Sequence, residues 1–334
     1  MDMRSLRIGI CVIAAVCVAA DKPRMIEGVN TVTTQVFAPG RYSHFRCDSD
    51  GNIYLRVYTG ELTSPVVKVS PEGKLLTTFL SDSPSKLVSI QDFWVTSTGE
   101  VFVLAEKGGG EGAILVFDAD GKSKEEVLLD VPVRPNQLAV FASGDFLVGG
   151  REVVVPLEER SVANGSPFLA IFNSRGQLLK RIQLPKDVKP KAKQPLTRAD
   201  LNYAETVVNS ATEISDDGTV YFVRHTRTGP VYAISAGGRV TRTVRLKPPE
   251  GAILSTVKVA RGTVAAEFVK NGADDGRALS VIIQIIDLKS ATKLAEYLST
   301  PPLGPDFACY EPNSFTFIAS DQNGHLTITS AAGQ

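Results

Sequence analysis

Polar side chains that could bind a small molecule, or exchange a proton with it, recur at one position of a repeated sequence pattern. Seven or eight residues before successive tight turns lie His44, Asp92, Asn136, Gln137, Ser210 and Asp306. Histidine and carboxylate groups exchange protons, whereas amide and hydroxyl groups form the hydrogen bonds that orient a ligand. If equivalent positions meet in the fold, these side chains form a polar ring that binds a ligand. The alternative is that they cap strand ends and hold water.

Four oxygen-bearing side chains near this position would also suit a calcium ion, because calcium prefers carboxylate and amide oxygens. They are Asp92, Asn136, Asn209 and Asp306. The sequence has three histidines and contains neither a His-x-x-x-His nor a Cys-x-x-Cys motif, so a zinc site is not indicated. Apart from calcium, no cofactor is expected.

A second group of candidate residues is basic. Arg56, Arg151, Arg224 and Lys270 fall at or just beyond the ends of predicted strands, and His225 and Arg227 are adjacent to Arg224. A concave basic surface favours an anionic ligand such as a carboxylated sugar, a phosphate ester or an acidic peptide. We expect Arg224, His225 and Asp92 to share one concavity. The ligand-binding candidates are therefore His44, Asp92, Asn136, Gln137, Arg151, Arg224, His225, Arg227 and Asp306.

Motifs of known catalytic chemistry are absent from the sequence. There is no Gly-x-Ser-x-Gly, and the glycine run after Lys107 lacks the Lys-Ser/Thr pair of a phosphate-binding loop. The residues favour a binding protein without chemistry, whose partner is a small, possibly anionic, ligand or another protein. The alternative is a metal-assisted lactonase, hydrolase or lyase that uses the same polar ring.

The repeated pattern predicts the elements that position these side chains. Six tight turns are closed by Gly51, Gly99, Gly144, Gly218, Gly262 and Asn313, at spacings of 48, 45, 74, 44 and 51 residues. Each turn precedes a strand rich in β-branched or aromatic residues, and most units contain a second turn. Hairpins at such a period, with four strands in each unit, are typical of a β-propeller. The sequence predicts an all-β, six-bladed β-propeller, with a β-sandwich as the alternative.

The two ends of the sequence indicate how the ring closes. The last unit has only three predicted strands, 306–310, 314–320 and 325–330, whereas the segment Val29–Phe37 is β-branched and has no partner of its own. We expect this N-terminal strand to complete the last blade, because that pairing hides an edge and ties the two ends together.

The repeated turn-and-strand pattern resembles a known family over nearly the whole chain beyond the signal peptide, and the first unit shows it clearly. The turn and strand Asp48–Tyr54, followed by Val66–Leu75, resemble NHL-type and related six-bladed propellers. The resemblance implies the architecture but no single activity, since such propellers include lactonases, lyases, sensors and protein-binding modules. In a propeller, the long second-to-third and unit-to-unit connections share one face, and we expect binding on that face.

The N-terminal residues predict the cellular location. Arg4 and Arg7 precede an unbroken apolar run that ends at Ala20, which is the pattern of a signal peptide at 1–20 cleaved near Ala20. A lipoprotein signal using Cys17 is the alternative. Residues 21–334 would then form a single propeller domain in the periplasm or outside the cell, and we expect a monomer.

Composition excludes two further classes of protein. The chain has 36 basic and 36 acidic residues, which argues against nucleic-acid binding driven by net charge. It also lacks an apolar run of about 18 residues, the length needed to span a membrane.

Cys47 and Cys309 are the two cysteines beyond the signal peptide, and both lie four residues before a turn. Two outcomes stay open: a disulfide that locks the ring, or two buried free thiols. Equivalent residues of neighbouring units point the same way round a ring, which favours the free thiols.

Overall fold

The computed structural model describes residues 23–36, 41–58, 65–80, 87–107, 110–153, 166–185, 210–214, 217–226, 229–271, 278–321 and 323–333. The predicted signal peptide and the site candidates Asn209 and Arg227 lie outside these ranges. Within them, the secondary structure consists of strands β1 to β24. No helix in this part of the chain is long and apolar enough to cross a membrane.

Four of the sheets contain four strands each, which follow one another in chain order from the innermost to the outermost strand. The first contains β2 (Arg41–Cys47), β3 (Ile53–Tyr58), β4 (Val66–Val69) and β5 (Leu75–Phe79). The second contains β6 (Leu87–Val95), β7 (Val101–Lys107), β8 (Glu111–Phe117) and β9 (Ser123–Leu128). The third contains β10 (Val133–Val140), β11 (Phe146–Glu152), β12 (Pro167–Phe172) and β13 (Leu178–Arg181). The fourth contains β14 (Ser210–Ile214), β15 (Val220–Arg224), β16 (Pro230–Ile234) and β17 (Val240–Arg245).

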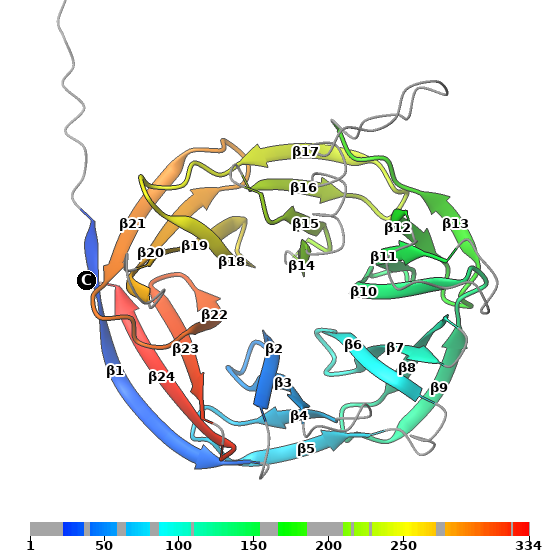
Figure 1. The fold of residues 1–334 in the computed structure, drawn as a ribbon, viewed down its shortest axis with the longest axis horizontal. Coiled ribbons are helices and arrows are strands. Elements are labelled where there is room, and N and C mark those ends of the chain that lie inside the picture. Colours follow the sequence, from blue (N-terminus) through cyan, green and yellow to red (C-terminus); the bar gives the residue numbers. More distant parts are fainter. Residues whose placement is uncertain are drawn as a thin grey trace, which may run out of the picture.

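The remaining strands form one eight-stranded sheet in the order β18-β19-β20-β21-β1-β24-β23-β22. Its strands are β18 (Ile253–Ala260), β19 (Thr263–Asn271), β20 (Ala278–Asp287), β21 (Lys293–Ser299), β1 (Arg24–Gln35), β24 (His325–Gly333), β23 (Ser314–Ser320) and β22 (Asp306–Glu311). Figure 1 shows the sheets arranged in a ring, with β2, β6, β10, β14, β18 and β22 nearest the centre. Both edge strands of the eight-stranded sheet therefore face the axis.

The expected all-β propeller is confirmed, but the prediction of six blades is wrong. The structure has four four-stranded sheets and one sheet of eight strands. The N-terminal segment pairs with the last strand, β24, in antiparallel register from Ile26↔Gly333 to Gln35↔His325. It does not complete a separate blade, because Arg24 and Met25 pair in parallel with Tyr297 and Leu298 of β21. β1 thus joins the last two predicted units, β18–β21 and β22–β24, into one sheet.

The strand sequences match their places in the sheets. Middle strands such as β16 (PVYAI) are buried along their whole length, because neighbouring sheets cover both of their faces. Outer strands such as β9 (SKEEVL) are mostly exposed. The tight turns need glycine: at Gly176, where φ is 79°, a Cβ atom would lie 1.9 Å from the carbonyl oxygen of Leu128.

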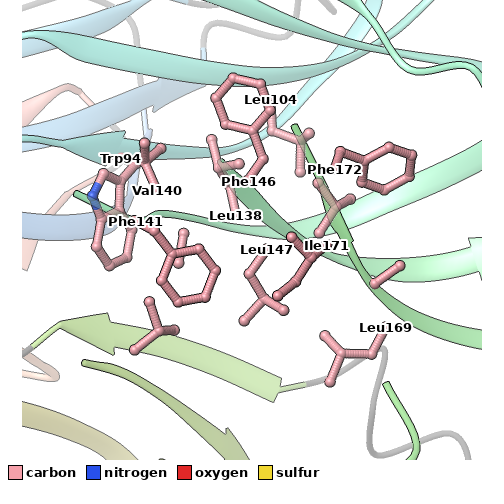
Figure 2. Close-up of a cluster of buried hydrophobic side chains, with 14 of the residues drawn as sticks. Trp94, Leu104, Leu138, Val140, Phe141, Phe146, Leu147, Leu169, Ile171 and Phe172 are labelled. Carbon is pink, nitrogen blue, oxygen red and sulfur yellow. The ribbon is translucent and has the colours of Figure 1, made fainter. Parts of the chain in front are cut away.

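Large apolar side chains fill the space between neighbouring sheets. The cluster of Figure 2 includes Trp94 of β6, Phe146 of β11 and Phe172 of β12. Leu104, Leu138, Val140, Phe141, Leu147, Leu169 and Ile171 belong to the same cluster. Packing of this kind holds the innermost strands at fixed positions around the axis.

Cys47 of β2 and Cys309 of β22 form a disulfide, with Cα atoms 5.8 Å apart. The preference for free thiols is therefore wrong. The reason is a β-bulge: the register of β22 shifts between Phe307 and Cys309, so Cys309 does not share a face with Phe307, as residues two apart in a regular strand would. The bulge turns Cys309 toward its neighbour, and the bond links positions 262 residues apart in the sequence.

Candidate functional site

A cavity of about 330 Å³, which we call the central chamber, lies among the innermost strands. Its walls come from all six of them and from β19. The lining residues are Tyr42, Ser43, His44, Phe45, Arg46, Asp92, Asn136, Gln137, Ser210, Ala211, Thr212, Glu213, Ser255, Thr256, Lys258, Glu267, Pro305, Asp306 and Phe307. Residues far apart in the sequence thus line one cavity that is open to solvent on one side.

The structure brings the whole polar ring together: His44, Asp92, Asn136, Gln137, Ser210 and Asp306 all line the central chamber. β-Bulges help to place them. His44 and Asn136 are each the extra residue where the register shifts, between Ser43 and Phe45 and between Pro135 and Gln137. A bulge re-aims side chains that regular alternation would direct into the packing between sheets.

The basic candidates lie elsewhere. Arg151 and Arg224 are on second strands, β11 and β15, and neither lines the central chamber. Arg224 is fully buried, whereas His225, directly after β15, is exposed. Asp92 therefore lies in the chamber without Arg224 or His225, and the expected shared concavity is not observed among the residues that the structure describes.

Arg46 of β2 reaches across the axis at the side of the chamber nearer the tight turns. Its Nε donates to the carbonyl oxygen of Phe93 at 2.6 Å, and its Nη atoms donate to the carbonyl and Oγ1 oxygens of Thr212 at 3.1 and 3.2 Å. The guanidinium carbon also lies 4.4 Å from the centroid of the Trp94 ring. Arg46 thereby connects β2 with β6 and β14.

The carboxylate of Asp92 completes this contact. Its Oδ2 lies 3.6 Å from Arg46 Nη2 and accepts a hydrogen bond of 2.9 Å from the Leu138 amide. Its Oδ1 accepts a hydrogen bond of 2.8 Å from the Phe93 amide. Both oxygens of Asp92 are thus used within the protein.

Lys258 of β18, like Arg46, contacts two other innermost strands, β2 and β14. Its ammonium group donates to the carbonyl oxygen of Phe45 at 2.8 Å and to Glu213 Oε1 at 3.3 Å. Thr212 Oγ1 also donates to the Leu138 carbonyl oxygen at 2.7 Å. We call Arg46, Asp92, Thr212, Glu213 and Lys258 the cross-channel network. It ties five innermost strands together and pairs its own charges.

The remaining carboxylates of the chamber have a different environment. Glu267 of β19 is 1% exposed, and neither of its oxygens has a hydrogen-bond partner in the described part of the chain. Burial raises the pKa of Glu267 to about 7; Asp306 adds to the rise, while the Ser255 hydroxyl and Lys258 oppose it. Burial likewise raises the pKa of Asp306. Both groups can hold a proton at a pH where ordinary carboxyl groups cannot.

His44 of β2 is another titratable group that lines the chamber. Its backbone has φ 53°, a left-handed conformation that is unusual for a residue with a side chain. His44 is partly exposed, and the loss of surrounding water lowers its pKa; Arg56, Arg46 and Lys258 act in the same direction, against Asp92. A neutral imidazole can accept or donate a proton.

The suggested calcium ligands are only partly together. Asp92, Asn136 and Asp306 line the central chamber, but the oxygens of Asp92 already accept two amide protons and face Arg46. In the described ranges, no group of three or more His, Cys, Asp or Glu side chains is arranged to hold a metal ion. Calcium binding stays a prediction.

The sequence analysis missed the charged residues Arg46, Glu213, Lys258 and Glu267. A signal was present for three of them, since each is a lone charge between apolar neighbours in a strand: Phe45-Arg46-Cys47, Val257-Lys258-Val259 and Ala266-Glu267-Phe268. A charge in such a setting is buried with a partner or lines a cavity.

Comparisons with known proteins identify no family for this chain. No protein-family model and no curated protein matches the sequence. Among solved structures, virginiamycin B lyase from Staphylococcus aureus is similar at 11% identity and a TM-score of 0.48, over 90% of this chain and 99% of that one. PQQ-bound aldose sugar dehydrogenase from Streptomyces coelicolor has 12% identity and a TM-score of 0.48, over 91% and 99%. The Pan2 WD40 domain from Neurospora crassa has 11% identity and a TM-score of 0.48, over 94% and 96%. These neighbours are β-propeller proteins, and they do not single out the NHL type.

Proposed function

We propose that this protein binds a small polar molecule in the central chamber. One observation carries the proposal: polar and titratable side chains from every innermost strand converge on one concave space of about 330 Å³. Ligand pockets are concave, enclose most of the ligand and contain a few convergent polar groups. A volume of this size is near the lower end for such pockets, which favours a small ligand over a segment of a partner protein.

The rigidity of the chamber supports binding. The cross-channel network engages its polar groups with one another and with backbone groups, so those side chains are fixed before a ligand arrives. Fixed side chains lose little conformational entropy on binding. The disulfide between Cys47 and Cys309 holds β2 beside β22, where two walls of the chamber meet.

Location outside the cytoplasm is part of the same proposal. The N-terminal sequence pattern supports export, and a disulfide between Cys47 and Cys309 is more stable in an oxidising compartment than in the cytosol. Sequencing the N-terminus of the exported protein tests this directly. We expect it to begin at Asp21, directly after Ala20.

An enzymatic function is the second candidate, and one observation favours it. Glu267, with its pKa of about 7, and His44, with its lowered pKa, border the same chamber. General acids and bases work best when their pKa lies near the operating pH. A hydrolase or lyase could use this pair. Hydrolysis of a lactone panel by the protein, with a pH profile that turns near 7 and is lost in Glu267→Gln, would favour this candidate.

A variant that fills the chamber tests the binding proposal. Asn136 is half-buried in the wall formed by β10, so Asn136→Trp would place a large ring in the cavity. Asn30→Trp is the matched control, because Asn30 is exposed on the outer strand β1. The full protein and both variants are screened by ligand-observed NMR against one set of neutral, cationic and anionic fragments, and crystal structures locate the bound fragments.

We expect fragments to bind in the chamber of the natural protein and of Asn30→Trp, and to be lost in Asn136→Trp. Fragments that bind only at other surfaces, or that bind Asn136→Trp equally well, would contradict the proposal. Unfolding curves of both variants verify that the change in binding is not a loss of fold.

A further inference from the structure

We infer that the ligand of the central chamber carries an ammonium or guanidinium group, which Glu267 and Asp306 receive. This inference rests on the proposed binding function and adds the chemical class of the ligand. It also replaces the anionic ligand that the basic side chains favoured, because Arg151 and Arg224 do not line the chamber.

The balance of charge in the chamber is the first argument. Among its described lining residues, two side chains are cationic, Arg46 and Lys258, whereas four carry carboxylates. Arg46 lies beside Asp92 at 3.6 Å, and Lys258 beside Glu213 at 3.3 Å. The other two carboxylates, of Glu267 and Asp306, form no ion pair with the rest of the described chain. A ligand cation would supply the missing charge.

The position of Glu267 is the second argument. Along β19, Ala265 packs into the apolar cluster that contains Phe307 and Phe317, whereas Ala266 packs into the cluster on the opposite face. Strand alternation therefore directs Glu267 toward β22, the strand of Asp306. A buried carboxyl group without a hydrogen-bond donor is costly, at about 1–3 kcal/mol or more. The Ser255 hydroxyl lies near Glu267 but does not meet hydrogen-bond geometry with either oxygen, so protons of a ligand ammonium group would be the donors.

Aromatic rings in the same wall are the third argument. Tyr42, Phe45 and Phe307 border the chamber from β2 and β22. The face of an aromatic ring attracts a cation, and the rings also contact the apolar part of an organic amine. An organic cation therefore fits this wall better than a hydrated metal ion, which has no apolar surface.

The affinity of the central chamber for a cation should depend on pH. The titratable groups around Glu267 are Asp306 on β22, Lys258 on β18 and, across the chamber, His44 on β2; Arg46, Asp92 and Glu213 belong to the cross-channel network. A pKa of about 7 means that Glu267 is mostly protonated at pH 5.5 and mostly ionised at pH 8. Because the ionised form attracts the cation, we expect affinity to rise over this range, by about tenfold per pH unit where Glu267 is protonated.

Three molecules of similar shape test the charge of the ligand. Cyclohexylammonium, cyclohexanol and cyclohexanecarboxylate share one ring and differ in the charged group. Binding of each to the full protein is measured by calorimetry at pH 5.5 and pH 8, in amine-free buffers. The same titrations use Glu267→Gln, Asp306→Asn and the control Glu125→Gln, which removes an exposed carboxylate of β9.

We expect cyclohexylammonium to bind the natural protein and Glu125→Gln at pH 8, with at least tenfold weaker binding at pH 5.5 and in Glu267→Gln. Asp306→Asn should weaken it less. Binding of the alcohol or the carboxylate at equal or higher affinity would overturn the inference while leaving the chamber as a binding site. Absence of ammonium binding while other fragments occupy the chamber would do the same. A chamber that accepts no fragment would refute the proposed function itself.

Discussion

Replacing the buried carboxyl group of Glu267 by an amide should change how the stability of the protein depends on pH. The pKa of Glu267 is about 7 in the folded protein, against 4.5 for an ordinary glutamate. Below about pH 4.5 the group is protonated in both the folded and the unfolded state. At higher pH the folded protein keeps a proton that the unfolded chain releases, so the free energy of unfolding falls as the pH rises.

The size of this effect follows from the difference between the two pKa values. Each unit corresponds to about 1.4 kcal/mol, so the loss approaches about 3 kcal/mol once the pH exceeds 7. Glu267→Gln keeps the shape of the side chain and removes its titration. We expect the variant to match the natural protein near pH 4.5 and to be more stable by about 3 kcal/mol at pH 8.

Urea unfolding at several pH values between 4.5 and 8 measures the difference. Trp94 is the single tryptophan and is buried at 2% exposure, so its fluorescence reports on loss of the fold. Amine-free buffers keep the chamber empty, and the exposed-carboxylate variant Glu125→Gln corrects for the change in net charge. A stability difference between Glu267→Gln and the natural protein that stays constant from pH 4.5 to 8 would refute the reasoning, because only a titrating group makes the difference grow.

Three other experiments test the framework around the chamber. Arg46→Met should cost about 3 kcal/mol in urea unfolding at pH 7, because it leaves the buried Asp92 carboxylate without its cation; an unchanged midpoint would contradict the network. The double variant Cys47→Ser/Cys309→Ser should lose about 3 kcal/mol, and peptide mapping of the unreduced protein should recover the two cysteines linked. His44→Gly should be at least as stable as the natural protein and His44→Val less stable by about 1–3 kcal/mol, since φ is 53° there; equal stability of the two variants would count against backbone strain.

The sequence predicted the strands and the ring well, because tight turns leave a strong local signal. Turn glycines such as Gly51, with φ 77°, are required by backbone geometry and therefore mark the hairpins. The error in the sheet count arose at one strand. The β-branched residues that signal β1 begin at Val29, whereas the parallel pairing with β21 is made by Arg24 and Met25, which lack such a pattern. Nothing local in the sequence shows that pairing.

The candidate site was predictable only for residues at aligned positions. His44, Asp92 and Asp306 share a place relative to the turns, and the fold converts that shared place into a common chamber. Glu267 lies on a second strand and reaches the chamber through the face that it presents to β22, so alignment of innermost strands could not find it. The bulge before Cys309 was equally hidden, since its one-residue shift depends on the pairing with β23.

The position of β1 has a consequence for the protein during translation. This strand leaves the ribosome before any other strand of the sheet, yet both of its hydrogen-bonding partners, β21 and β24, lie near the end of the chain. A nascent chain therefore carries an unpaired, β-branched strand while more than 250 residues are still to be made. Unpaired strands are prone to associate with other chains. Slow elongation over the last third of the sequence should consequently increase aggregation, even when the four-stranded sheets have already formed.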